Sequence, residues 1–197
     1  SQSIHAWAAH IPGVKVVVPS TAGECKGLLK TAIRDNDPVM FFEHKMLYTT
    51  KFNDVPEVEE DVCIPFGRAR IVAEGADITV VTNSMMTIKA EKAVRQLQKE
   101  GISAELIDLR TIVPLDTETI IRSVKKTGKL LIVDEGHLSF GITGEIASRI
   151  MPDVFYDLDA PIQRMGTADV PLPFSPALEF PLIPDEKKIA AKIREMV

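Results

Sequence analysis

The stretch ITVVTNSMMTIKAEKAVRQLQKEGISAELIDL, residues 78–109, decides which fold this sequence can adopt. It opens with residues 78–82, a β-branched and apolar run that is typical of a buried strand. The apolar residues that follow recur at the spacing of one helix face: Ala90, Ala93, Val94 and Leu97. Gly101 is a residue type that commonly ends a helix, and residues 104–109 form a second strand-like run. The stretch therefore predicts a strand, a helix and a second strand.

The same alternation continues toward the carboxyl end. Residues 130–133 predict a third strand. Helices are predicted from Asp116 to Gly128, from Thr143 to Met151 with Pro152 halting it, and from Asp185 to the end, with apolar residues on one face of each. Strands that are apolar on both faces and alternate with helices are typical of an α/β fold, with a mostly parallel sheet covered by helices on both faces.

The first 48 residues predict a second, smaller α/β unit. Residues 14–18 form a β-branched run, and Thr21 with Glu24 gives a helix capping pattern. The helix should end near residues 35–38, before a short strand at 39–42. The strand–helix–strand crossover should be right-handed. Two strands make only part of a sheet, so we expect them to need further neighbours.

Composition excludes several classes of protein. The 197 residues are 45% hydrophobic and 26% charged, which is typical of a folded globular chain. The net charge of -5 disfavours nonspecific nucleic-acid binding, and no apolar run reaches the length of a membrane span. Cys25 and Cys63 are far apart and lack metal-like spacing. They do not suggest a disulfide scaffold, which favours a reducing compartment. A chain that opens on Ser1 without Met is expected to be processed or incomplete.

No strong catalytic motif is present: we find no P-loop, no G-x-S-x-G and no metal-ligand cluster. Residues 141–144, GITG, open a helix and could hold an anion, but they lack the dinucleotide fingerprint, so a plain turn is favoured. The histidines have no carboxylate or cysteine partner at a telling spacing, which favours packed or surface roles: His5, His10, His44 and His137.

Side chains that follow predicted strands are the natural place for a ligand site. In an open α/β sheet, ligands bind beyond the carboxyl ends of the strands, which nominates Asn83, Arg110 and Asp134. A structural role for Asp108 and Arg110, as a strand-end ion pair or a fixed loop, is the favoured alternative. Arg70 and the pair at residues 125–126 are predicted to be solvated surface charges.

Several short motifs become specific through their order and spacing. In the first 48 residues they are Ser1-Gln2-Ser3, Ala6-Trp7, residues 10–17, residues 26–30, residues 32–35 and residues 42–48. In the second half they are residues 108–112, Pro114-Leu115-Asp116, residues 158–161 with Arg164, and Asp169-Val170-Pro171 with Pro173-Phe174. Together they resemble the carboxyl-terminal part of the beta chain of thiamine-diphosphate-dependent 2-oxo-acid dehydrogenases, the decarboxylating component of pyruvate or acetoin dehydrogenase-like complexes.

The resemblance implies a domain order. Residues 1–48 would be the second half of a pyrimidine-binding thiamine-diphosphate domain. The acidic stretch at residues 49–65 would be a linker. Residues 66–197 would be a transketolase carboxyl-terminal-type domain.

The resemblance also implies a chemistry. Thiamine diphosphate, with magnesium, would lie between an alpha and a beta chain, decarboxylate a 2-oxo acid and pass the acyl unit to a lipoyl group. The beta chain's histidine would immediately precede Ser1, and its glutamate would lie further upstream. We therefore expect no catalytic and no cofactor-binding residue in this chain. Ser1 and Gln2 would lie near the site.

One metal site is implied as well. Relatives hold potassium through carbonyl oxygens at a helix end, which by motif position would involve Ala32, Ile33, Asp35 and Asp37 here. Terminal helix carbonyls lack internal partners and carry partial negative charge, so they suit a hard cation. The alternative is an ordinary capped helix end.

The implied partners are an alpha chain, a second beta chain and the lipoyl acyltransferase component, in the cytoplasm or the mitochondrial matrix. Two other functions stay open: an acetoin dehydrogenase beta subunit, and a non-catalytic module that docks the acyltransferase. The choice among pyruvate, branched-chain oxo acids and acetoin cannot be read from these residues.

Overall fold

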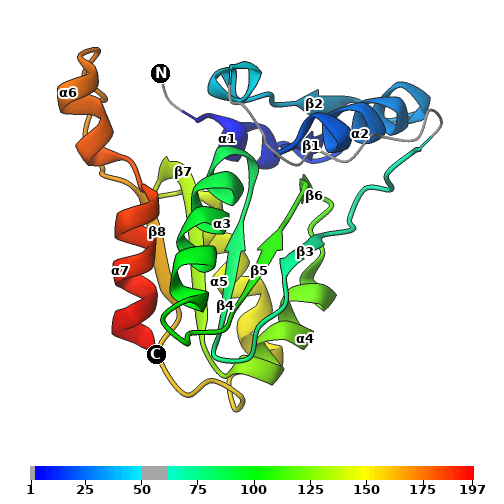
Figure 1. Ribbon diagram of the computed structural model, residues 1–197. Coiled ribbons are helices and arrows are strands. Elements are labelled where there is room, and N and C mark those ends of the chain that lie inside the picture. Colours follow the sequence, from blue (N-terminus) through cyan, green and yellow to red (C-terminus); the bar gives the residue numbers. More distant parts are fainter. Residues whose placement is uncertain (1–2, 50–61) are drawn as a thin grey trace.

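The computed structural model describes residues 3–49 and 62–197. Figure 1 shows the chain coloured along the sequence. In chain order, the elements are α1 (His5–Ala9), β1 (Lys15–Val17), α2 (Ala22–Arg34), β2 (Val39–Phe41), the 3-10 helix η1 (Lys45–Tyr48), β3 (Arg70–Ala73), β4 (Ile78–Thr82), α3 (Ser84–Gln98), β5 (Ala104–Asp108), β6 (Thr111–Val113), α4 (Thr117–Thr127), β7 (Leu130–His137), α5 (Ile142–Val154), β8 (Gln163–Thr167), α6 (Pro176–Glu179), the 3-10 helix η2 (Phe180–Leu182) and α7 (Glu186–Met196).

The larger sheet has five strands in the order β3-β5-β4-β7-β8. Strand β4 pairs in parallel with β5 and β7, and β7 pairs in parallel with β8, whereas β3 runs antiparallel to β5. Every residue of β4 and β5 is buried. This arrangement confirms the predicted α/β fold with a mostly parallel sheet.

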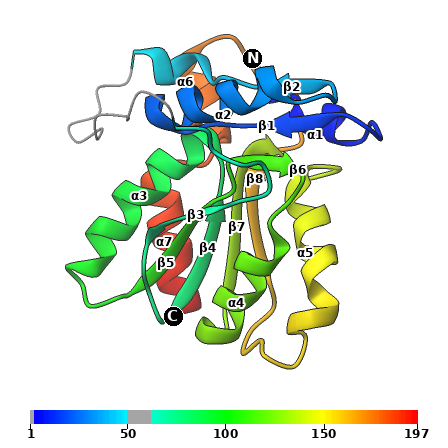
Figure 2. The same ribbon diagram turned by 90° about the vertical axis from the view of Figure 1, so that its right-hand side faces the viewer.

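Helices cover both faces of this sheet (Figure 2). On one face, α3 and α7 pack on side chains such as Val80 and Leu131. On the other face, α4 and α5 pack on neighbours such as Val81 and Ile132. Val80 and Val81 are adjacent in β4 and point to opposite faces, as the alternation of a strand requires. A β-branched run without polar breaks is therefore what a sheet buried on both sides needs.

The N-terminal segment (residues 3–49) lies across one end of the larger sheet (Figure 1). It forms a second sheet of three strands in the order β2-β1-β6. Strand β1 pairs in parallel with β2 and antiparallel with β6. Strand β6, from the later part of the chain, therefore supplies the further neighbour that β1 was expected to need.

Other sequence-based expectations are corrected by the structure. The pattern does not predict β3, β6 or β8. The helix expected to stop before Pro152 continues to Val154, with Pro152 inside its last turn. Near a helix end the missing N–H of proline removes a single backbone hydrogen bond, so the helix can tolerate it there. The predicted linker lies mostly outside the described residues, and the division into domains at 48 and 66 stays a prediction.

None of the helices within residues 3–49 and 62–197 combines the length and the apolar character that crossing a bilayer requires.

We expect the backbone amides of β4 to exchange with solvent at least about a hundredfold more slowly than those of β2. Strand β4 is fully buried and paired on both sides, whereas β2 is the edge of the smaller sheet and Met40 at its centre is 46% exposed. Native-state hydrogen exchange measured by mass spectrometry checks this. Strand β3 is the control, because it is also an edge strand but belongs to the larger sheet. Equal protection of β2 and β4 would contradict the prediction.

Candidate functional site

Polar side chains gather where β4 and β7 meet the N-terminal segment. Asp134, in β7, is 1% exposed and accepts three hydrogen bonds. One comes from Nε2 of His5 in α1 at 2.9 Å, one from Nδ2 of Asn83 at 2.9 Å, and one from the backbone N–H of Gly136 at 3.1 Å. A buried carboxylate is tolerated when its oxygens are satisfied in this way.

The next residue along β7 makes a second bond to the N-terminal segment. Both oxygens of Glu135 lie 3.0 Å from Nε2 of His44, and the Ser3 hydroxyl donates to Oε1 at 3.3 Å. The Nδ1 atom of His44 accepts the Met46 N–H at 3.2 Å, so Nε2 is the atom that carries the hydrogen toward Glu135. We call the His5–Asp134 and His44–Glu135 pairs the histidine joint.

The electrostatics of the histidine joint favour the ionised forms of its two carboxylates. Burial lowers the pKa of His5, but the nearby Asp134 and Glu135 outweigh burial, and the net pKa is raised. Burial raises the pKa of Asp134, but His5 and Asn83 outweigh it and the pKa is lowered. Burial also raises the pKa of Glu135, but His44 and Lys89 outweigh burial and the pKa is lowered. Each carboxylate is engaged by an imidazole, so the joint holds two parts of the chain together.

A second cluster joins the N-terminal segment to β3 and β5. Glu24, in α2, is 4% exposed and lies between two guanidinium groups. Its Oε1 atom forms an ion pair with Nε of Arg70 at 2.7 Å and accepts from Nε of Arg110 at 2.8 Å. Burial raises the pKa of Glu24, but both arginines and the Ser20 hydroxyl outweigh it and lower the pKa. We call this cluster the arginine joint, formed by Ser20, Glu24, Arg70, Asp108 and Arg110.

Arg110 also contributes through its backbone. It adopts a φ of 60°, a left-handed conformation that costs a non-glycine residue on the order of 1 kcal/mol. In that conformation its N–H donates to Asp108 Oδ1 at 3.2 Å, and its carbonyl accepts the Val18 N–H at 2.8 Å. The strained backbone is therefore held by bonds to both sides of the joint.

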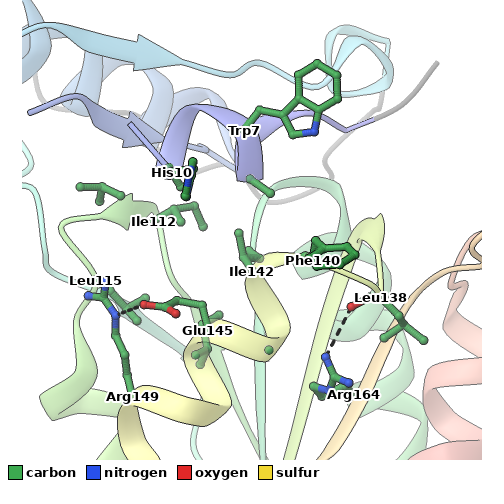
Figure 3. Close-up of a pocket in the computed structure, with 16 residues that line it drawn as sticks. Trp7, His10, Ile112, Leu115, Leu138, Phe140, Ile142, Glu145, Arg149 and Arg164 are labelled. Atoms are coloured by element: carbon green, nitrogen blue, oxygen red, sulfur yellow. Dashed lines mark hydrogen bonds and ion pairs between the residues drawn. The ribbon is translucent and has the colours of Figure 1, made fainter. Parts of the chain in front are cut away.

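One pocket borders the histidine joint, and another lies between the N-terminal segment and α5. The smaller, about 210 Å³, lies against the histidine joint between Ser3, Phe42, Lys45 and Ser84. The larger, about 840 Å³, lies between α1 and the start of α5 (Figure 3). Its lining is mostly apolar; the residues labelled in Figure 3 are Trp7, His10, Ile112, Leu115, Leu138, Phe140, Ile142, Glu145, Arg149 and Arg164.

The charged groups of the larger pocket already have partners. Arg149 donates to Glu145 at 2.5 Å, and Arg164 donates to the Leu138 carbonyl at 3.4 Å (Figure 3). The GITG turn lies at its edge, where Gly141 precedes α5 without a side-chain cap. The larger pocket is thus an apolar groove with a paired polar rim.

A ligand site at the strand ends stays a prediction, and the structure brings together only two of the three residues nominated for it. Asn83 and Asp134 lie together, whereas Arg110 points to Glu24. His5 and His44 have carboxylate partners in the fold, which spacing along the sequence could not indicate.

Arg70 and Lys126 are not plain surface charges either. Arg70 pairs with Glu24, and Lys126 pairs with the buried carboxylate of Glu105. In both cases the partner is distant in the sequence, so spacing along the chain carries no signal for it.

Neither cysteine is in a disulfide, as the sequence predicts. The pKa of Cys25 is raised to about 12 by burial and by the neighbouring Glu43 carboxylate, so its thiol stays protonated. A reactive cysteine needs the opposite shift.

The predicted potassium ligands lie at the end of α2. The Ala32 carbonyl accepts the Asp35 N–H at 3.3 Å, and Ile33 is 75% exposed. The Lys15 ammonium lies 2.7 Å from the Asp35 carboxylate and 3.1 Å from that of Asp37. A cation, the Lys15 ammonium, therefore already pairs with both carboxylates at this helix end.

No group of three or more histidine, cysteine, aspartate or glutamate side chains within the described ranges could hold a metal ion.

The fold and the two joints define a class of α/β protein. In this class, part of a second α/β unit packs against the carboxyl ends of the strands of a mostly parallel sheet. Residues 67–189 match the model of the family "Transketolase, C-terminal domain", and residues 1–51 match "Transketolase, pyrimidine binding domain". The chain belongs to the transketolase C-terminal domain family.

Three curated relatives match nearly the whole chain. The pyruvate dehydrogenase E1 component subunit beta of Rickettsia felis is 47% identical over 100% of this chain and 59% of its own. The 2-oxoisovalerate dehydrogenase subunit beta of Bacillus subtilis is 44% identical over 100% and 60%. The acetoin:2,6-dichlorophenolindophenol oxidoreductase subunit beta of Cupriavidus necator is 46% identical over 99% and 57%.

One solved structure agrees with them. A split gene transketolase in an inactive beta4 tetramer superimposes with a TM-score of 0.77 at 25% identity, covering 98% of this chain and 60% of that one. The resemblance to beta chains of 2-oxo-acid dehydrogenases is thus confirmed. The chain spans about three fifths of the length of these curated relatives.

Replacing Glu24 with alanine should lower the free energy of unfolding by about 2–4 kcal/mol, because two guanidinium groups then lose their buried counter-ion. The matched control is Glu145→Ala, which breaks the exposed Glu145–Arg149 pair and should cost less than about 0.5 kcal/mol. Urea denaturation of the variants and the parent measures both values. Similar costs for the two variants would contradict the assigned role of the arginine joint.

Proposed function

We propose that this chain is the carboxyl-terminal part of the beta subunit of the decarboxylating component of a 2-oxo-acid dehydrogenase complex. The complete enzyme would decarboxylate pyruvate or a related 2-oxo acid oxidatively and transfer the acyl unit to a lipoyl group. The proposal is supported above all by one observation: the chain is 44–47% identical to named dehydrogenase beta subunits over its whole length.

In this proposal the described residues act as scaffold. The carboxylates of the histidine joint are occupied by imidazoles, and that of Glu24 by guanidinium groups. That this chain holds no catalytic residue stays part of the proposal.

Thiamine diphosphate would serve as the cofactor, since it supplies an electron sink for the carbanion left by decarboxylation. The described residues alone do not fit its magnesium ion, because they hold no suitable cluster of ligands. We therefore propose that magnesium is bound outside residues 3–49 and 62–197.

The other partners follow from the same proposal. They are a second beta chain and the lipoyl acyltransferase component, with no nucleic acid and no membrane among them. The compartment would be the cytoplasm, or the mitochondrial matrix in a eukaryote.

Two further functions keep specific support. Acetoin dehydrogenase is favoured by the 46% identity to the Cupriavidus necator subunit. A non-catalytic module for the acyltransferase is favoured by the fact that the described carboxylates at both joints are paired and offer no free base. The two differ in whether these residues support turnover at all.

We expect the full-length protein, mixed with its alpha chain, thiamine diphosphate and magnesium, to oxidise one 2-oxo acid at least about tenfold more efficiently than the others. Efficiency is compared as kcat/KM, because that ratio measures discrimination. Pyruvate, 2-oxoisovalerate and acetoin are tested side by side. A clear preference for acetoin would replace the main proposal by the acetoin alternative.

The control for that experiment is residues 1–197 alone. Calorimetric titration with thiamine diphosphate and magnesium should show no micromolar binding, whereas the acyltransferase docking domain should bind if the module function is correct. Specific micromolar cofactor binding by 1–197 would refute the scaffold role.

We also propose potassium at the end of α2, held by carbonyl oxygens of Ala32, Ile33, Asp35 and Asp37. The exposure of the helix end supports the proposal, and the Lys15 ammonium competes with it. Exchanging sodium for potassium at equal ionic strength should raise the Tm of the full-length protein by about 2–5 °C.

Lys15→Met is the informative variant for that test. It removes the competing ammonium and should enlarge the potassium effect on Tm. Identical Tm values in the two salts, for parent and variant alike, would rule the site out.

A further inference from the structure

Asp108 is the most enclosed acid of the arginine joint. It ends β5 and is 0% exposed. Three elements face it: β3 through Arg70, whose Nη2 lies 3.5 Å from Oδ2; the turn after β5 through the Arg110 N–H; and the N-terminal segment through Ser20 and Glu24. Its contact with the Ser20 hydroxyl is the closest of these.

Ser20 lies between two carboxyl groups, and its hydrogen count sets a constraint. Its Oγ atom is 2.7 Å from Oε2 of Glu24 and in direct contact with Oδ2 of Asp108. A hydroxyl has one hydrogen, so it can donate to only one of the two carboxyl groups. The other oxygen–oxygen contact needs a proton on the acid.

The surroundings decide which acid carries that proton. Glu24 faces both guanidinium groups at 2.7–2.8 Å, so it is the ionised partner. Burial and, after it, the charge of Glu24 raise the pKa of Asp108 to about 7, against the opposing contacts of Ser20, Arg70 and the Arg110 N–H. The chain of donors therefore runs from the Asp108 carboxyl through the Ser20 hydroxyl to the Glu24 carboxylate.

We propose that Asp108, Ser20 and Glu24 form a proton-operated latch between the N-terminal segment and the larger sheet. With its proton, Asp108 donates across the joint and the latch is closed. Without it, two carboxylates repel each other across Ser20, and Arg70, which faces both, is drawn from Glu24 toward Asp108. The ion pair between Glu24 and Arg70, which holds α2 on the larger sheet, is then weaker.

The direction of the pH dependence follows from the two pKa shifts. The pKa of Asp108 is raised in the folded state, so its contribution to stability is complete below its ordinary pKa of about 4 and is lost as pH rises toward 7. Glu24 has a lowered pKa, and its contribution is complete above about pH 5. Between about pH 5 and pH 7, a change in the free energy of unfolding therefore reports mainly on Asp108. His5, whose pKa is raised, loses stability over the upper part of the same window.

The test is urea unfolding of the full-length protein and its Asp108→Asn variant between about pH 5 and pH 7. The parent's unfolding equilibrium constant should rise on the order of fiftyfold over this window. The amide of the variant imitates the protonated acid, so the variant should keep only the smaller rise due to His5. Asp153→Asn, an exposed change in α5, is the matched control and should keep the parent's full pH dependence.

Equal pH dependence in the parent and Asp108→Asn overturns the latch. If the variant does not fold, infrared spectra of the parent decide instead. A protonated carboxyl band that is present near pH 5.5 and lost by about pH 8.5 supports the latch, because an ordinary aspartate is already ionised at the lower value. A spectrum without that band overturns it.

Discussion

The structure depends on one electrostatic constraint: a carboxylate buried in α2 needs positive charge from beyond its own segment. Glu24 obtains that charge from Arg70 and Arg110, which belong to the larger sheet and to the turn after β5. A charge left unpaired at this depth would cost several kcal/mol. The position of α2 is therefore tied to β3 and β5, and the pairing of β1 with β6 follows the same placement. The left-handed backbone of Arg110 is held there by bonds from both sides.

The histidine joint has a comparable effect at the carboxyl ends of β4 and β7. In open α/β sheets this edge is the usual place for a ligand. Here it is occupied largely by the chain's own residues, since His5 and His44 lie on the two carboxylates of β7. A site of this kind holds neighbouring segments of the chain in position.

Much of the fold could be predicted from the sequence, because long apolar runs and helical spacing are local signals. Strands β4, β5 and β7 and the helices between them follow from such runs. Strands β3, β6 and β8 could not be predicted in this way, since they are short or polar and gain their order from neighbours. The histidine joint and the arginine joint could not be predicted from the sequence for a related reason. His5 and Asp134 are 129 positions apart, and only the folded chain brings them together. The family resemblance carried fold and function, but not these pairings.

The pairing of β1 with β6 has an evolutionary consequence. A strand from the later part of the chain completes the sheet of the earlier part, so the two units are interleaved and not merely adjacent. Genetic recombination that replaced residues 1–49 alone would bring in a β1 selected against a different β6, together with a different set of partners for Arg70 and Arg110. Such hybrids would carry mismatched register and unpaired charge. We therefore expect the two units to be inherited together, because each carries residues that the other needs.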